Sequence, residues 1–284
     1  MMLLQYTVLL LLSLFLSTTF SASIPEPLSN PSTLESSLDS SLEPRENAVK
    51  VVDPKYFHEP GGGDVYGHYD VRYFQGQPVS YEVKQDTLRH LIRSYLTVFR
   101  SLNIDTWIAH GTLLGWWWNG KIMPWDWDLD TQVSDSTLLW LGENMNMTFH
   151  NHTFASDTPG GPDDVRTYLL DVNPHITERV RGDGMNIIDA RWIDTKTGLF
   201  IDITGISETE PKKAPGVWSC KNYHRFQTRD IWPLRETVFE GTPALVPHAF
   251  EEILQKEYST FALTKTVHEG YVFSLSSHPV FLPE

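Results

Sequence analysis

The chain has 284 residues and a formal net charge of −14, with 22 Lys and Arg against 36 Asp and Glu, which argues against nucleic acid or an anionic membrane as a partner held by bulk electrostatics. Its length and 40% hydrophobic content suit one globular domain. The single cysteine, Cys220, excludes an intramolecular disulfide, and no Cys/His cluster has the spacing of a zinc finger.

Residues 1–23 have the composition of a signal peptide. Met1 to Phe20 is strongly apolar, and Ser21-Ala22-Ser23 offers a cleavage site of small residues. The segment lacks Lys and Arg and is just long enough to span a bilayer, so retention as a signal-anchor is the alternative. Residues 24–54 are rich in Ser, Pro and Glu, which predicts a flexible stalk. The folded domain is then expected over residues 55–284.

Residues 82–102 repeat apolar side chains with the period of a helix. This pattern predicts a helix that packs on a sheet and has a structural role. The apolar stripe consists of Leu88, Leu91, Ile92, Tyr95, Phe99 and Leu102.

A strand, a turn and a helix are predicted next. Thr106–Ala109 reads as a short buried strand, and Leu113–Trp118 as a short helix that ends near Asn119-Gly120. His110-Gly111-Thr112 forms the turn between them. A glycine at such a turn lets the backbone approach a phosphate, and the helix N-terminus offers free N–H groups. The turn therefore predicts a phosphate cradle, although a Gly-Thr pair can also be only a turn.

Three aspartates then occupy alternate positions, at Asp126, Asp128 and Asp130. If this segment is a strand, all three carboxylates share one face, and Trp127 and Leu129 face a core. Unpaired carboxylates on one face repel one another, and a divalent cation with oxygen ligands offsets that repulsion. The alternative is an acidic edge strand exposed to water. A phosphate cradle followed by metal-binding carboxylates favours phosphoryl transfer.

Two N-glycosylation acceptor sequences, Asn146-Met147-Thr148 and Asn151-His152-Thr153, follow a helix predicted over Ser136–Met147. Such sites have meaning only in the secretory pathway. We therefore expect the chain to enter that pathway and to be exposed at these asparagines.

A hairpin is predicted further along, with strands over Met185–Asp194 and Leu199–Thr204. Asp202 lies in the apolar run of the second strand, where a lone carboxylate is costly unless it meets a cation or a donor. Two partners remain open: a structural salt bridge to Arg191 across the hairpin, or a metal shared with the earlier aspartates.

The C-terminal part contains an aromatic stretch and a helix. Trp218–Trp232 is mixed in charge, and it is expected either to line the donor or acceptor pocket or to pack as core. Cys220, within it, is expected to be a buried small residue rather than a nucleophile. Pro247 is expected to open the helix. The apolar face of that helix is Phe250, Ile253, Leu254 and Tyr258.

The order of glycine-bearing turn, helix, paired acids and distant acidic strand resembles the nucleotidyltransferase fold. The stretch HGTLLGWWWNGKIMPWDWDLDTQV and, less closely, GLFIDITGI and DIWPLRETVFEG are similar to the LicD family, which includes bacterial phosphocholine transferases and the animal fukutin-related protein. The Trp-rich version, with YFHEPGGGDVYGHYD upstream, resembles the fungal branch, whose members are tied to adding mannosylphosphate to glycoprotein mannans. The resemblance covers roughly residues 55–260, and it departs from many relatives at Trp127, where they carry a small or polar residue.

The resemblance implies an α+β fold, with a nucleotidyltransferase-like mixed β-sheet flanked by helices in a single catalytic domain. It implies a phosphotransferase that takes a sugar-phosphate or alcohol-phosphate from a CDP- or GDP-linked donor to a glycan of a glycoprotein or cell-wall polymer. The place of action would be the Golgi lumen or membrane, or the protein would be secreted. A D-x-D glycosyltransferase and a non-catalytic Golgi regulator of mannosylphosphorylation are the alternatives.

The expected site follows from the same resemblance. Asp128, Asp130 and Asp202 would act in catalysis and hold one or two Mg²⁺ or Mn²⁺ ions, with Asp126 as a further, outer metal residue. Asp202 would otherwise accept the proton of an acceptor hydroxyl. His110 and Lys121 have ordinary alternatives, as a structural histidine and a solvated turn lysine. The residues expected to contact the donor are His110, Gly111, Thr112, Lys121 and Arg191.

Overall fold

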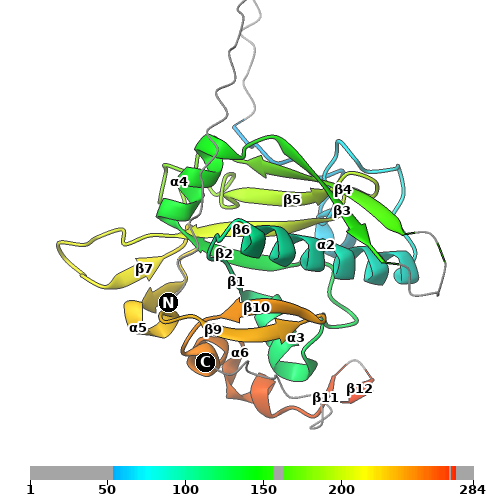
Figure 1. Ribbon diagram of the computed structural model, residues 1–284. Coiled ribbons are helices and arrows are strands. Elements are labelled where there is room, and N and C mark those ends of the chain that lie inside the picture. The colour runs from blue at the N-terminus through cyan, green and yellow to red at the C-terminus, as the bar shows by residue number, and fades with distance from the viewer. Residues whose placement is uncertain (1–53, 156–160, 162, 269, 273–284) are drawn as a thin grey trace, which may run out of the picture. The chain divides into compact units, whose positions relative to one another are not determined.

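The computed structural model describes residues 54–155, 161, 163–268 and 270–272 of the chain (Figure 1). The expected signal segment and the expected stalk, except for residue 54, lie outside these residues. None of the described helices is long and apolar enough to cross a lipid bilayer.

The helices are α1 (Gly63–Tyr66), α2 (Tyr81–Ser101), α3 (His110–Asn119), α4 (Asp135–Asn144), α5 (Thr228–Ile231) and α6 (Phe250–Thr264). The strands are β1 (Trp107–Ile108), β2 (Asp130–Ser134), β3 (Thr148–Phe154), β4 (Asp164–Val172), β5 (Ala190–Asp194), β6 (Phe200–Ile206), β7 (Val217–Ser219), β8 (Arg225–Gln227), β9 (Arg235–Phe239), β10 (Thr242–Val246), β11 (Val267–His268) and β12 (Tyr271–Val272).

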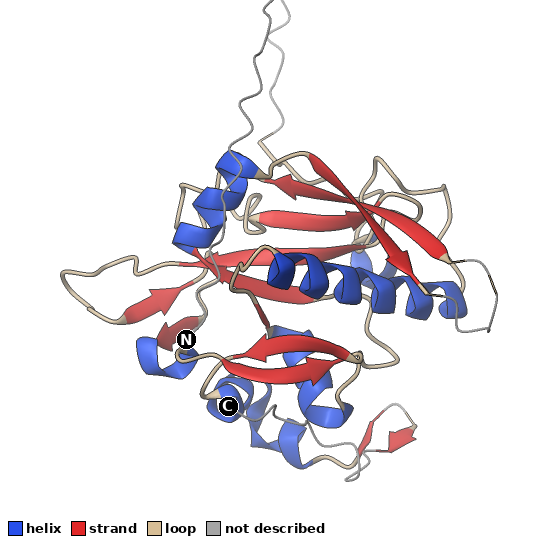
Figure 2. Ribbon diagram, viewed as in Figure 1, coloured by secondary structure: helices blue, strands red, loops and turns tan. Residues whose placement is uncertain are grey.

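A six-stranded mixed sheet is the framework of the domain, in the order β1-β2-β6-β5-β4-β3. Neighbouring strands run antiparallel, except for β2 and β6, which are parallel. Helices lie beside this sheet, with the long helix α2 running across it (Figure 2). The predicted architecture, a single α+β domain with a mixed sheet flanked by helices, is therefore confirmed.

Helix α2 packs against β5 and β6 through the stripe predicted from the sequence. The helix begins where the Ser80 hydroxyl accepts a hydrogen bond from the backbone N–H of Val83 at 3.4 Å. Ser94 accepts a hydrogen bond from the indole N–H of Trp192 in β5 at 3.1 Å. Leu102 departs from the prediction, because it follows the last residue of α2 and is 45% exposed. The buried members of the stripe are Leu88, Leu91, Ile92, Tyr95 and Phe99.

The two faces of the sheet have different neighbours. Along β6, Ile201 and Ile203 join the core that α2 covers, so Asp202 and Thr204, at the alternate positions, project from the opposite face. The adjacent β2 has the same arrangement, because Thr131 donates its hydroxyl to Tyr95 of α2 at 3.1 Å and Asp130 therefore points the other way. Acidic and polar side chains of two parallel strands thus share the face away from α2.

Strand β5 covers only the last five residues of the strand predicted over Met185–Asp194. Two carbonyl groups in the segment before it accept hydrogen bonds from side chains. The Asn186 oxygen accepts a hydrogen bond from Lys221 Nζ at 2.9 Å. The Ile188 oxygen accepts one from Asn173 Nδ2 at 3.0 Å. Because these side chains satisfy the backbone, the segment needs no strand partner.

Two further helices differ from the prediction at one end. Helix α6 begins at Phe250 rather than at Pro247. The intervening His248 and Ala249 donate their backbone N–H groups to carbonyl groups of α5, at 3.1 and 2.9 Å, and are therefore not helical. The helix predicted over Ser136–Met147 is α4, which ends before the first glycosylation sequence.

Candidate functional site

Four aspartates lie together where β2 and β6 run side by side. Asp130 of β2 and Asp202 of β6 are partners in the parallel register, so their side chains leave the same face of the sheet. Asp126 and Asp128 lie in the segment before β2 and interact electrostatically with Asp130. The predicted strand through all three alternate acids is wrong in this respect, because β2 begins only at Asp130.

Lys84 of α2 explains why the acidic segment is not a strand. This lysine is 1% exposed, and its ammonium group donates to the backbone oxygens of Pro124 at 3.2 Å and Asp126 at 2.6 Å. The same group lies 4.6 Å from the ring centroid of Trp127. Burial lowers the pKa of Lys84, an effect that the charge of Asp126 partly offsets. A side-chain cation thus bonds the carbonyl groups that a neighbouring strand would otherwise bond.

The aspartates are crowded enough to perturb one another's ionisation. Burial, followed by the hydrogen bond and the charge of Asp128, raises the pKa of Asp126 to about 8. Burial also raises the pKa of Asp130 to about 8; the positive charge of His110 opposes this rise, and the charges of Asp128 and Asp202 add to it. Full ionisation of the group is therefore unfavourable unless a cation lies beside it.

The predicted turn His110-Gly111-Thr112 is instead the first turn of α3, which begins at His110, and it packs directly against the acids. A Cβ atom at Gly111 would lie 3.2 Å from Asp126 Oδ2 and 3.9 Å from the hydroxyl of Tyr258, so a side chain here would crowd the carboxylate. Thr112 is buried, and its Oγ1 accepts a hydrogen bond from the backbone N–H of Asp130 at 2.8 Å. The Thr112 hydroxyl therefore holds the start of β2 in place.

Asp202 and Arg191 form a salt bridge, which is one of the two partners of Asp202 that the sequence allowed. Arg191 Nε donates to Asp202 Oδ1 at 2.8 Å, and Nη2 donates to Glu59 Oε1 at 2.7 Å. The guanidinium is buried, with its carbon 3.7 Å from the ring centroid of Phe200. Burial raises the pKa of Asp202 even though Arg191 opposes the rise. The pair fixes the orientation of the Asp202 carboxylate beside Asp130.

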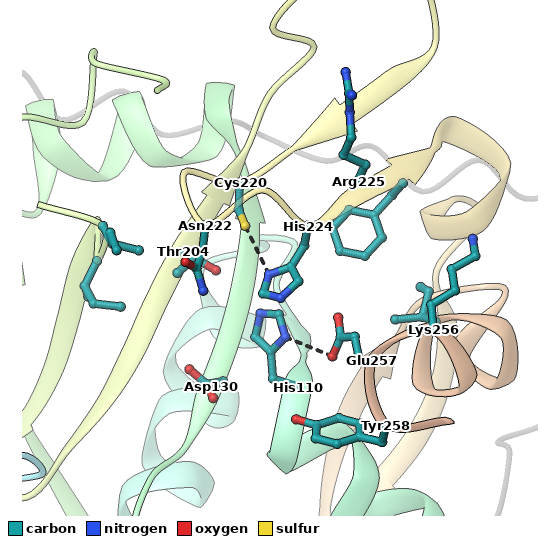
Figure 3. A pocket seen from close by; sticks show the side chains of 14 residues that line it. His110, Asp130, Thr204, Cys220, Asn222, His224, Arg225, Lys256, Glu257 and Tyr258 are labelled. Atoms are coloured by element: carbon teal, nitrogen blue, oxygen red, sulfur yellow. Dashed lines mark hydrogen bonds and ion pairs between the residues drawn. The ribbon is translucent and has the colours of Figure 1, made fainter. Parts of the chain in front are cut away.

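A second group of ionisable side chains consists of His110, His224 and Glu257 (Figure 3). His110 is the first residue of α3, and its Nδ1 lies 3.0 Å from Oε2 of Glu257 in α6. The ring of His224, from the segment between β7 and β8, has its centroid 4.5 Å from that of His110, at an interplanar angle of 42°. The ligand atoms of the three residues lie within 4.8 Å of one another, close enough to hold a metal ion.

The two histidines have opposite electrostatic environments. Burial disfavours the charged form of His110, but the hydrogen bond to Glu257 and the charges of Asp130, Glu257 and Asp128 outweigh it, so the pKa of His110 is raised. Burial and the neighbouring charge of His110 lower the pKa of His224. A positive charge in this group is therefore best placed between His110 and Glu257.

These side chains line a cavity of about 540 Å³. Of the four aspartates, Asp130 reaches its wall. Thr204 also lines it, and its buried hydroxyl has no hydrogen-bond partner among the described residues. Tyr258 contributes a hydroxyl whose pKa is raised by burial and by the nearby carboxylates, so it keeps its proton. The other residues that line the wall are Ile187, Ile188, Cys220, Asn222, Arg225, Phe226, Ile253 and Lys256.

The residues predicted to contact the donor are in different environments. His110 lines the cavity, whereas Lys121 is exposed on the turn after α3 and does not line it. Both interpretations of the stretch Trp218–Trp232 hold for part of it. Residues within 220–226 line the cavity, and the tryptophans at its two ends pack against the core. The residues of this region that the sequence did not single out are Lys84, Thr204, His224 and Glu257.

Comparison with known proteins identifies related sequences. The LicD/FKTN/FKRP nucleotidyltransferase domain family matches residues 103–249, just over half of the chain. Mannosyltransferase regulator 4 of Saccharomyces cerevisiae is 34% identical over 177 residues, which are 59% of this chain and 14% of the yeast protein. Mannosyltransferase regulator 14 of the same yeast is 33% identical over 176 residues, 58% of this chain and 18% of the relative. The regions matched in the two yeast proteins are less than a fifth of each yeast protein's length. The LicD family model matches more than half of this chain, which therefore belongs to the LicD family.

Proposed function

We propose that the chain is a metal-dependent phosphotransferase. It moves a sugar-phosphate or alcohol-phosphate, of the mannosylphosphate or phosphocholine type, from a CDP- or GDP-linked donor to a glycan of a glycoprotein or cell-wall polymer. The observation that carries the proposal is the parallel register of Asp130 and Asp202, with Asp126 and Asp128 beside them. Asp130 connects this group to the wall of the 540 Å³ cavity. Membership of a family described as a nucleotidyltransferase domain supports the reaction class.

The donor atoms of the acidic group suit Mg²⁺ or Mn²⁺, because all of them are carboxylate oxygens. Asp128, Asp130 and Asp202 would hold the ion or ions, and Asp126 would support them from the preceding segment. A bound ion of this kind would neutralise charge on the donor diphosphate and polarise the transferred phosphoryl group. Arg191 orients Asp202 through Oδ1, at 2.8 Å, so the ion pair and a ligand role for Asp202 are compatible.

The remaining cavity side chains suit an anionic donor with an apolar part. Arg225 and Lys256 provide positive charge at the wall, and the hydroxyl of Tyr258 stays protonated as a hydrogen-bond donor. Ile187 and Phe226 offer an apolar surface on which a base or an alcohol group can pack. The volume of about 540 Å³ lies within the usual range of small-molecule sites.

A regulatory role is the second candidate, and the relatives motivate it. Both yeast proteins are named mannosyltransferase regulators, and both are several times longer than the region they share with this chain. In that case the cavity would bind a ligand without turning it over. A place in mannose-containing glycosylation, in the Golgi or elsewhere in the secretory pathway, is common to both candidates.

A donor screen separates these functions. The purified chain is incubated with CDP- and GDP-linked donors, Mn²⁺ and mannan, and the released nucleotide is identified. Phosphotransfer yields a nucleoside monophosphate and a phosphodiester, whereas a D-x-D glycosyltransferase yields a nucleoside diphosphate. The matched control is the Asp128→Asn, Asp130→Asn double variant, which should release neither. Release of no nucleotide, together with stimulation of a separate mannosyltransferase, would establish the regulator instead.

A further inference from the structure

His110, His224 and Glu257 lie beside the acidic group but share no ligand with it. We propose that they form a second cation site, one that selects a borderline transition metal such as Zn²⁺ over Mg²⁺. Two imidazole nitrogens and one carboxylate oxygen make up the protein ligands of many catalytic zinc sites, which keep one position open. Magnesium, by contrast, prefers oxygen ligands alone. The proposal concerns metal binding and does not depend on the proposed transfer reaction.

The three ligands come from separate elements that already converge. The ligand atoms lie within 4.8 Å of one another before any ion is considered, and His110 Nδ1 and Glu257 Oε2 are only 3.0 Å apart. In Figure 3 the His224 ring lies between Cys220 and His110, and the Glu257 carboxylate faces the same space. An ion here would replace the proton that His110 and Glu257 share in the hydrogen bond.

Neighbouring groups orient both imidazoles, as they do around bound metals. Nδ1 of His224 lies 3.3 Å from Sγ of the buried, free Cys220, which leaves Nε2 of that ring to face His110. Nε2 of His110 lies 3.4 Å from Nε2 of Gln132. The Gln132 amide is itself oriented, because its Oε1 accepts a hydrogen bond from the indole N–H of Trp107 at 3.1 Å. Nδ1 of His110 is therefore the nitrogen directed at the cluster.

Backbone strain supports a specific placement of His110. This residue has a φ of +50°, in the left-handed region that non-glycine residues rarely occupy. Such strain persists only where the surrounding structure holds it, and it is typical of functional positions. Here it turns the imidazole of the first residue of α3 toward α6.

A second observation also indicates a ligand in this cavity. Thr204 is 6% exposed and lines the cavity wall, yet its Oγ1 has no hydrogen-bond partner in the described part of the chain. A buried hydroxyl without a partner costs free energy unless a bound group or water completes it. Asp130 lines the same wall, and its carboxylate, once ionised, would favour a cation in the cavity.

The competing interpretation is that His110 and Glu257 only tie α3 to α6 through a hydrogen bond. Cobalt(II) distinguishes the two, because its visible absorption reports the ligands and geometry around the ion. Tag-free chain is treated with a chelator, desalted and titrated with Co²⁺, and competition with Zn²⁺ and with Mg²⁺ follows. With millimolar Mg²⁺ present to occupy the acidic group, we expect one Co²⁺ per chain with a visible band, which Zn²⁺ displaces.

Variants then assign the ligands. His224→Ala and the isosteric Glu257→Gln should each weaken Co²⁺ binding by on the order of 100-fold or more, beyond the loss typical of residues that only orient a ligand. His175→Ala is the matched control, because His175 pairs with Glu178 at 2.9 Å on the surface and its removal should change nothing. The Asp128→Asn, Asp130→Asn double variant should keep the visible band, because those acids supply no ligand to this ion, and it should weaken Co²⁺ affinity far less than His224→Ala or Glu257→Gln.

Thermal unfolding of each variant shows that it is folded before binding is interpreted. Absence of a stoichiometric Co²⁺ band in the unmodified chain would overturn the proposal. So would a band that persists in both His224→Ala and Glu257→Gln. Loss of transfer activity plays no part in these outcomes, so a failure of the proposed phosphotransferase would be seen separately, in the donor screen.

Discussion

Lys84 shows how one buried charge can position a site from a helix on the far side of the sheet. Its ammonium group bonds the carbonyl oxygens of Pro124 and Asp126, and its removal would leave both without that donor. The Pro124 oxygen also accepts a hydrogen bond from Gln85 Nε2 at 2.9 Å, so only the Asp126 carbonyl would be left unsatisfied. Lys84→Met should therefore lower the free energy of unfolding by about 1–3 kcal/mol. It should also reduce Mn²⁺ affinity, because the backbone of Asp126 loses its hydrogen bond from the Lys84 ammonium group.

Chemical denaturation and Mn²⁺ titration of the Lys84 variant test this expectation. Lys212→Met is the control, because Lys212 is exposed and its loss should change stability by no more than about 0.5 kcal/mol. A Lys84→Met protein as stable as the control would mean that water replaces the ammonium group at no cost.

Asp202 and Arg191 form a salt bridge, and substitution of each residue should have a different effect on stability and activity. In Asp202→Asn the amide oxygen can still accept from Arg191, which also keeps Glu59, so the fold should survive while transfer is nearly abolished. Arg191→Met would leave the buried Asp202 carboxylate without its cation, whereas Glu59 keeps its pair with Lys55, and it should cost about 3–5 kcal/mol. Melting temperature and transfer rate of both variants are measured. Full activity in a stable Asp202→Asn protein would remove Asp202 from the catalytic group.

At the scale of single residues, the sequence singled out the aspartates that the structure brings together, but it did not single out Lys84, the cation beside them. Alternation in an apolar run marks Asp202 as costly, and the opposing strand offers Arg191, so that pair could be predicted. Lys84 could not, because a lysine on a helix carries no sign of whether its ammonium group reaches solvent or a distant backbone. Its contacts lie 40 and 42 residues away along the chain.

At the scale of elements, the acidic segment and β6 form a unit whose stability should depend on pH. The folded chain raises the pKa of Asp126 and Asp130 to about 8, so between roughly pH 4 and 8 it binds more protons than the unfolded chain. The contribution of these groups is therefore greatest below about pH 4 and is lost as pH rises through 8. Without metal, the melting temperature should fall across this interval.

Mn²⁺ should reverse that fall, because it replaces the protons on the carboxylates. We expect the Mn²⁺-induced rise in melting temperature to be several degrees larger at pH 8 than at pH 5.5, which for a domain of this size is about 1–2 kcal/mol. The Asp126→Asn, Asp130→Asn variant should show a flatter pH dependence and no such rise. An equal response at both pH values, or in both proteins, would contradict the assignment of these acids to one metal-binding unit.

Periodic elements were predictable, and their ends were not. Helix α2 and strand β6 carry strong 3.6-residue and apolar signals, and both appear where expected. The start of β5 and the start of α6 were wrong, because side chains and α5 bond the backbone in the segments before them. These bonds join parts of the chain that local patterns do not connect.

At the scale of the whole molecule, the fold assembles a site that sequence spacing does not reveal. His110 and Glu257 are 147 residues apart and meet only because α3 and α6 pack together. Metal-ligand motifs are recognisable when ligands are close in sequence, and here each ligand comes from a different element. The aspartates could therefore be picked out from the sequence, whereas the grouping of His110, His224 and Glu257 could be recognised only from the folded structure.

The two N-glycosylation sequences lie at an edge of the sheet that is distant from the acidic group. Asn146 and Asn151 are exposed at and beside β3, which is an edge strand of the sheet, with β4 and β5 between it and β6. A glycan there would shield unpaired strand edges and lie away from the acidic group. We expect protein from the native host to carry N-glycan and to gain mobility on enzymatic deglycosylation.

Thr153→Ala tests this with little disturbance, because Thr153 is exposed and the Asn151 side chain keeps its hydrogen bond from Thr167. The variant should lose one glycan and retain its transfer rate, since the edge strand is remote from Asp130 and Asp202. Unchanged mobility after deglycosylation would show that neither site is occupied. A large loss of activity in Thr153→Ala would mean that the edge at β3 contributes to acceptor binding, and the acceptor would then have to reach across the sheet rather than enter at the cavity alone.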